Sequence, residues 1–142
     1  MAIWASYEPG STFKILTLSA AVNEGKVDLL KDTFYAGDIG STELADRLAA
    51  FRPLRAVCGN CDGGDLRRMF PEVLRFKCEE VDVLMKHIGG YPGNYDRSIV
   101  GRIYSSPPKL FISGHSHILK VKYDKTLGLL HINPGAAGQP FT

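Results

Sequence analysis

The stretch Leu110-Phe111-Ile112-Ser113-Gly114-His115-Ser116-His117 decides the fold of this chain. An apolar run typical of a buried strand ends at a glycine, and two histidines one residue apart follow it. Side chains of extended backbone alternate with a period of two, so such neighbours point the same way. If the chain turns at Gly114, both imidazoles can reach one point in space from the end of the strand. Neutral imidazole is the commonest protein ligand for transition metals, so the pattern indicates a metal site. Two surface histidines in a loop are the alternative interpretation.

The composition excludes several classes of function. The 142 residues suit one domain, and 44% hydrophobic and 23% charged residues are ordinary for a globular protein. A formal net charge of +2 gives no indication of binding to nucleic acid or to an anionic membrane surface. No apolar run approaches the roughly 20 residues that cross a bilayer. Three cysteines, an odd number, and a start without the basic region of a secretory signal predict a reducing, cytoplasmic location.

Working outward from the two histidines, short apolar runs alternate with helical patterns, which predicts an α/β sandwich. We expect helices over 43–51 and 96–106, a polar turn after Asp62, and strands over 55–58, 74–78, 81–86, 109–113, 119–123 and 127–132. Polar side chains follow apolar runs beside glycines at four places along the chain: Asp38, Asn60, His87, and His115 with His117. Ligand sites of α/β sheets gather at strand ends. A carboxylate, an amide and imidazoles suit Mn, Fe, Zn or Ni better than a thiolate-rich site does.

In chain order, these motifs resemble the signature of the calcineurin-like metallophosphoesterases, most closely their small bacterial and archaeal phosphodiesterase branch. They read Gly37-Asp38, Gly59-Asn60-Cys61-Asp62, His87 and Gly114-His115-Ser116-His117. The resemblance covers residues 35–139 and implies an α-β-β-α sandwich that hydrolyses phosphoesters with divalent metal ions. Asp38 matches the family's bridging ligand of two ions. The residues matching Asn60, His87 and His115 complete one site, and the residue matching His117 serves the other.

Two departures from the family pattern concern catalysis. Cys61 stands where most members carry a histidine that assists the transition state or leaving group, and a thiol is a poorer proton donor there. Tyr7 and Pro9 stand where the family's first strand ends in Asp-x-His, which supplies two ligands to the first metal. We therefore expect one ion rather than two, with catalytic roles for Asn60, His87 and Cys61 and an activity that is weak or lost. Whether the chain is an enzyme stays open, and the family domain is expected to be truncated at both ends.

Residues 1–34 differ in character from residues 35–142, which form the metallophosphoesterase-like domain. The first segment resembles the penicillin-binding transpeptidases, whose Ser-x-x-Lys motif is matched by Ser11 and Lys14. The resemblance implies an acylated serine next to a lysine on the same helix face. The Ser-x-Asn and Lys-Thr-Gly motifs of that family are missing, so the chain reads as a chimera. A transpeptidase fragment is the remote alternative function.

A non-catalytic scaffold of the same fold, as in the retromer subunit, is the other alternative. Trp4, Phe13 and Phe141 are the apolar residues that we expect to serve a partner surface. A phosphoester is the expected substrate, and the formation of a homo-oligomer stays open. His131 is interpreted as a structural residue of a strand, and Asp62 as a residue that fixes its loop by hydrogen bonds.

Overall fold

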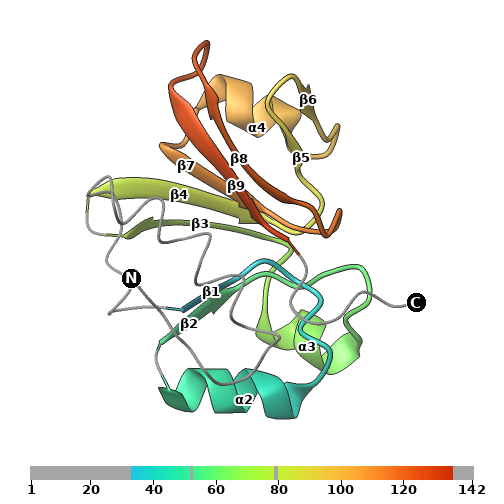
Figure 1. The fold of residues 1–142 in the computed structure, drawn as a ribbon. Coiled ribbons are helices and arrows are strands. Elements are labelled where there is room, and N and C mark those ends of the chain that lie inside the picture. The colour runs from blue at the N-terminus through green and yellow to red at the C-terminus, as the bar shows by residue number, and fades with distance from the viewer. Residues whose placement is uncertain (1–32, 52, 79, 136–142) are drawn as a thin grey trace.

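The computed structural model describes residues 33–51, 53–78 and 80–135 and shows four layers (Figure 1). Helices α2 (Thr42–Phe51) and α3 (Gly64–Met69) form the first layer, and the parallel strands β1 (Thr33–Tyr35) and β2 (Leu54–Ala56) form the second. A five-stranded sheet is the third layer. Helix α4 (Val100–Ser105) and the short hairpin of β5 (Gly90–Tyr91) and β6 (Asn94–Tyr95) cover its far face. The expected α-β-β-α sandwich is confirmed.

The five-stranded sheet brings the ends of β4 and β7 together. Its strands are β3 (Val73–Cys78), β4 (Val81–Lys86), β7 (Leu110–Ser113), β9 (Leu129–Pro134) and β8 (Leu119–Asp124), in this spatial order. Strands β4, β7 and β9 run parallel, whereas β3 and β8 are antiparallel edge strands. Lys86 pairs with Ser113, so the residues that follow both strands leave the sheet at the same edge. The amide of Gly114 donates to the carbonyl of His87 at 2.8 Å.

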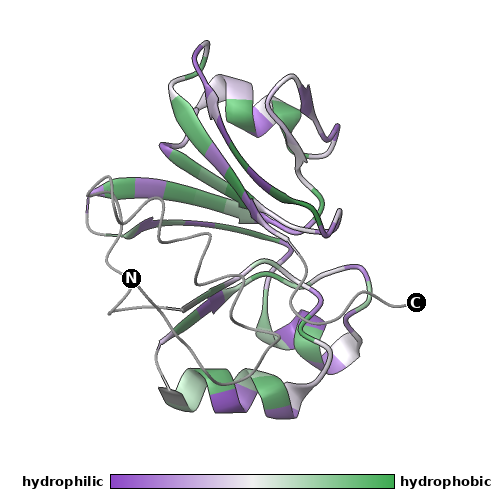
Figure 2. Ribbon diagram, in the orientation of Figure 1, coloured by the Kyte–Doolittle hydropathy of each residue, from purple (hydrophilic) through white to green (hydrophobic). Residues whose placement is uncertain are grey.

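Alternation along the strands divides the core into three apolar clusters, and Figure 2 shows apolar residues alternating with polar ones along these elements. On β4, Val83 and Met85 face the smaller sheet, whereas Leu84 faces α4. On β1, Phe34 packs between the two sheets and Tyr35 packs toward α2 and α3. Because each strand buries a fixed face, the pairing register of the strands is fixed, and the loops that follow them start from fixed positions.

Two elements were absent from the expectations. Residues 64–69 form α3 instead of a plain turn, and residues 90–95 form the β5–β6 hairpin. Only Leu66 of α3 is buried, so this helix has no apolar periodicity that a sequence could reveal. Helix α4 begins at Val100 and not at Asp96, because residues 96–99 form a turn in which the amide of Ile99 bonds to the carbonyl of Asp96.

Several predicted features lie outside the described residues. They include the Ser11 and Lys14 pair, the Tyr7 and Pro9 positions, and the apolar residues Trp4, Phe13 and Phe141. Within the part of the chain that the structure describes, no helix is long and apolar enough to cross a membrane.

Candidate metal centre

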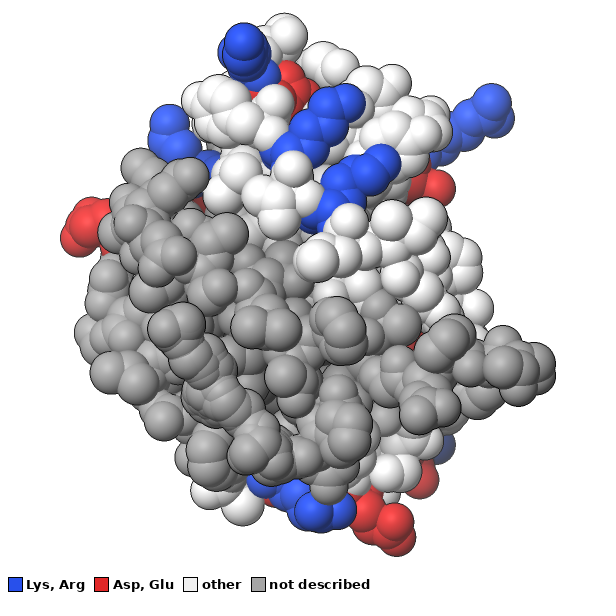
Figure 3. Space-filling view, viewed as in Figure 1, with Lys and Arg blue, Asp and Glu red and all other residues white. Residues whose placement is uncertain are grey.

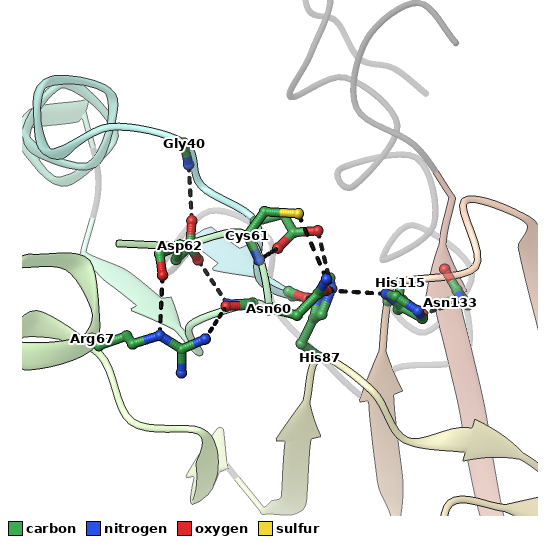
Figure 4. Close-up of polar contacts among 12 residues, drawn as sticks. Gly40, Asn60, Cys61, Asp62, Arg67, His87, His115 and Asn133 are labelled. Carbon is green, nitrogen blue, oxygen red and sulfur yellow. Dashed lines mark hydrogen bonds and ion pairs between the residues drawn. The ribbon is translucent and has the colours of Figure 1, made fainter. Parts of the chain in front are cut away.

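Four of the predicted ligands meet around the side-chain amide of Asn60 (Figure 4). The Oδ1 atom of Asn60 lies 3.0 Å from Nε2 of His87 and 3.1 Å from Nδ1 of His115. The Nε2 atom of His87 also lies 3.1 Å from Oδ2 of Asp38. These residues follow β1, β2, β4 and β7, so the two sheets together build the cluster.

The orientation of His87 decides what the cluster can bind. Its Nδ1 atom lies 2.7 Å from the carbonyl oxygen of Ala36, which only accepts hydrogen bonds, so Nδ1 carries the proton. In neutral imidazole Nε2 then presents a lone pair, and two oxygen acceptors, on Asn60 and Asp38, face it. The lone pair of Nε2 and the oxygens of Asn60 and Asp38 repel one another at these distances unless a cation lies between them. The cation is either a metal ion or a proton on Nε2 of His87. A metal-ligating histidine is commonly held through its other nitrogen in this manner.

The donor spacing fits a small divalent ion. Neighbouring ligands at bond lengths of about 2.1 Å and right angles lie about 3.0 Å apart, close to the spacings of 3.0 and 3.1 Å between these donor atoms. Among the described residues, no three His, Cys, Asp or Glu side chains form a metal-binding group by themselves. Asp38 and His87 are in direct contact, and His115 joins them through Asn60, so the amide is an essential member of the set.

The local charge also favours a cation. Tyr35, at the end of β1, has its pKa raised to about 12 by burial and by the negative charges of Asp62 and Asp38. Two carboxylates therefore concentrate negative potential at this edge of the smaller sheet.

The backbone is strained at three of the predicted ligand positions. Asp38, His115 and His117 have positive φ angles of 55°, 71° and 62°, a region that residues other than glycine seldom occupy. The chain turns after Ser113, as the glycine at position 114 indicated, and the two histidines lie within this turn and not in extended backbone. Such strain persists only where the surroundings enforce it, and it is concentrated at functional sites.

Two glycines allow the loops to approach the ligands. A Cβ atom on Gly59 would lie 2.0 Å from Oδ1 of Asp38, and one on Gly37 would lie 2.4 Å from Nδ1 of His87. Neither position has room for any side chain.

Asp62 ties the Asp38 loop to the Asn60 loop. Its carboxylate accepts hydrogen bonds from the amides of Gly40 (3.0 Å) and Gly59 (2.7 Å), and it is 4% exposed. The expected structural role of Asp62 is thus confirmed. Arg67 of α3 adds bonds to the carbonyls of Asp62 (3.0 Å) and Gly59 (3.2 Å).

Asn133 holds the histidine turn in the same way. Its Nδ2 atom donates to the carbonyl of Gly114 and to Oγ of Ser116, both at 3.0 Å, and its Oδ1 atom accepts from the amide of Gly135. Sequence analysis assigned no role to Arg67 or Asn133. The Asn133-Pro134-Gly135 turn was the only local signal for either residue.

The remaining predicted residues have different surroundings. Cys61 is an exposed free thiol whose backbone amide donates to Oδ1 of Asp38 at 2.9 Å. His117 is exposed, and the structure does not place it in the hydrogen-bonded cluster around Asn60. His131 is 1% exposed, and its Nε2 atom bonds to Oγ of Ser113 at 2.8 Å, in agreement with a structural role.

Comparisons with known proteins agree with the fold. The structure resembles a predicted phosphoesterase from Streptococcus pneumoniae (20% identity, TM-score 0.58, 95% of this chain and 72% of that one). It also resembles an archaeal phosphodiesterase (18% identity, TM-score 0.59, 87% and 76%). A third similar structure is Vps29 from Entamoeba histolytica complexed with zinc (20% identity, TM-score 0.59, 82% and 64%). At these identities the likeness concerns the fold.

Two comparisons concern the sequence itself. Stage V sporulation protein D of Bacillus subtilis is 57% identical to this chain over 42 residues, which are 30% of the chain and only 6% of that protein. Residues 15–142 match the calcineurin-like phosphoesterase superfamily domain, and this match begins within the segment that we assigned to the transpeptidase-like part. With most of its residues matched, the chain belongs to the calcineurin-like phosphoesterase superfamily.

Proposed function

We propose that the protein binds one divalent metal ion through Asp38, Asn60, His87 and His115 and hydrolyses phosphodiesters weakly. The observation that carries the proposal is the Nε2 atom of His87, which faces oxygens of Asn60 and Asp38 at 3.0 and 3.1 Å while Nδ1 contacts the carbonyl oxygen of Ala36 at 2.7 Å. Superfamily membership supports a divalent metal and a phosphoester substrate.

The donor chemistry selects among metals. Imidazole, carboxylate and amide ligands suit Mn, Ni, Zn or Fe, and one structurally similar Vps29 was crystallised with zinc. When bound, such an ion polarises a phosphoryl oxygen and lowers the pKa of water. The residues of the chain orient and support this chemistry. Ala36 holds His87 in its tautomer, and the amide of Cys61 holds one carboxylate oxygen of Asp38.

Weak activity is proposed because the sequence offers few ligands for a second ion. Tyr7 and Pro9 occupy the expected Asp-x-His positions. His117 would then be the second site's remaining side chain besides the shared Asp38. Cys61 also stands where most family members carry a histidine that assists the transition state or leaving group, and a thiol is a poorer proton donor there.

The test combines metal binding with turnover. Mn²⁺ or Ni²⁺ is expected to raise the thermal unfolding midpoint and to promote slow release of nitrophenol from bis(p-nitrophenyl) phosphate. Asp38→Asn should abolish both effects, whereas Asp46→Asn, an exposed carboxylate on α2, should abolish neither. Metal-dependent turnover that survives Asp38→Asn would refute the site. Turnover at rates typical of complete enzymes would refute the one-ion proposal.

A scaffold function is the second candidate, and an exposed apolar row favours it. Ile118, Leu119, Val121 and Tyr123 are 62%, 55%, 48% and 57% exposed on and beside the edge strand β8. A row of this size on an edge strand fits association with a second copy of the chain. Size-exclusion chromatography of Val121→Lys tests it: loss of a dimer seen in the parent protein would support the scaffold, and a monomeric parent would oppose it.

We also propose that residues 1–34 are a transpeptidase-like segment joined to the domain of residues 35–142. The Ser11-x-x-Lys14 motif supports this origin. Labelling of Ser11 by a fluorescent penicillin would show retained acylation, and the absence of label is expected because the other transpeptidase motifs are missing. Three cysteines, an odd number, support a reducing, cytoplasmic compartment.

A further inference from the structure

A cavity of about 470 Å³ opens beside His115, and neither Asp38 nor Asn60 is among its lining residues. The β5–β6 hairpin forms one wall, and β8 with the turn of residues 114–118 forms the other. Its volume lies in the range of small-ligand pockets. We call it the His115 pocket, because His115 belongs both to its lining and to the metal cluster.

The walls of the His115 pocket combine flat apolar surface with positive charge. Tyr91 and Ile118 supply apolar surface, and Nζ of Lys120 lies 3.8 Å from the centroid of the Tyr91 ring. Arg97 adds a second positive charge to the lining. The carboxylate of Asp96 also lines the pocket, and it accepts a hydrogen bond from the amide of Ser98 at 2.9 Å. Lys120 makes no ion pair with any residue of the described ranges. Figure 3 shows Lys and Arg side chains gathered on the upper part of the visible face.

Three hydrogen bonds hold the walls of the pocket in place. Nζ of Lys122 donates to the carbonyl of Pro92 at 3.2 Å, which ties the hairpin to β8. Oγ of Ser113 donates to the carbonyl of Gly90 at 3.2 Å and accepts from Nε2 of His131. A preformed pocket loses little conformational entropy when a ligand enters.

We propose that the His115 pocket binds the organic substituent of the phosphodiester, and that it selects a flat ring carrying a negative charge. The ring lies against Tyr91 and Ile118, and the negative charge meets Lys120 and Arg97. The inference rests on the proposed function, because His115 links the pocket to the metal cluster. It adds Lys120 and Tyr91 as residues that determine specificity.

The experiment measures binding without turnover. Naphthalene-2-sulfonate is a flat anion without a phosphate, and naphthalene-2-sulfonamide is its neutral counterpart. Both are titrated calorimetrically into the metal-free protein, and the sulfonate is expected to bind more tightly. Lys120→Met should weaken the sulfonate about tenfold, the loss of one charge-assisted hydrogen bond, and leave the sulfonamide within about twofold. Tyr91→Leu should weaken both compounds.

Matched controls keep the two proposals separable. Lys125→Met, in the turn between β8 and β9, should change neither affinity. Asp38→Asn should abolish phosphodiester turnover and leave sulfonate binding unchanged, so a failed metal site does not mask the pocket. The inference is overturned if the sulfonate does not bind, or if Lys120→Met affects the charged and neutral compounds equally.

Discussion

The buried imidazole of His131 makes the stability of this domain sensitive to acid. It is 1% exposed in the five-stranded sheet, and its Nδ1 atom has no hydrogen-bond partner within the described part of the chain. Burial, together with the positive charges of Lys120 and Lys122, lowers the pKa of His131 from 6.5 to about 4. The folded protein therefore disfavours the imidazolium form, whereas the unfolded chain accepts a proton at the ordinary pKa.

Linkage sets the direction and size of the effect. Between pH 6.5 and pH 4 the unfolded state binds more protons than the folded state, so the free energy of unfolding falls as the pH falls through this window. The contribution of neutral His131 is fully present above about pH 6.5. Its loss between pH 7 and pH 5 amounts to about 2 kcal/mol, and the complete loss below pH 4 to about 3 kcal/mol.

Urea unfolding followed by circular dichroism, in the presence of a chelator, measures this loss. His131→Gln keeps an amide donor for Ser113 and cannot titrate, so its free energy of unfolding should fall about 2 kcal/mol less than that of the parent between pH 7 and pH 5. His117→Gln removes an exposed imidazole and should keep the pH dependence of the parent. Equal losses in the parent and in His131→Gln would refute the reasoning.

Three further predictions concern two substitutions in the loops around the cluster and one on helix α4. Gly59→Ala should abolish the metal-induced rise of the unfolding midpoint, because its Cβ atom would lie 2.0 Å from Oδ1 of Asp38. A midpoint that still rises would show that the loop has room. Gly101→Ala on α4, with nothing within 4 Å of its Cβ atom, should raise the free energy of unfolding by about 0.5–1 kcal/mol, and destabilisation in the same urea assay would contradict this. Asp62→Ala leaves the amides of Gly40 and Gly59 without their acceptor and should cost about 2–4 kcal/mol. A cost below 1 kcal/mol in urea unfolding would mean that water replaces the carboxylate.

The sequence carried the order of most of the elements and the residues predicted as ligands. Apolar runs such as Leu110 to Ser113 predicted strands, because a short continuous apolar run that ends at a glycine is typical of a strand buried on both faces. The glycines beside Asp38 and Asn60 and the turn after Ser113 marked the strand ends. From these residues in chain order, both the α-β-β-α sandwich and four members of the cluster around Asn60 could be predicted.

Only the tertiary structure decided how these side chains meet. The tautomer of His87 held by Ala36 depends on a contact between segments far apart in the chain. So do the left-handed turn at His115 and His117, which Asn133 holds, and the bond from the amide of Gly40 to Asp62. The same is true of the His115 pocket, where Lys120 of β8 lies over Tyr91 of β5. The local sequence determines which face of a helix or strand is buried, because apolar residues recur along the chain with the period of that element. The partner of a polar atom is determined by packing, since any of several distant loops could have supplied it.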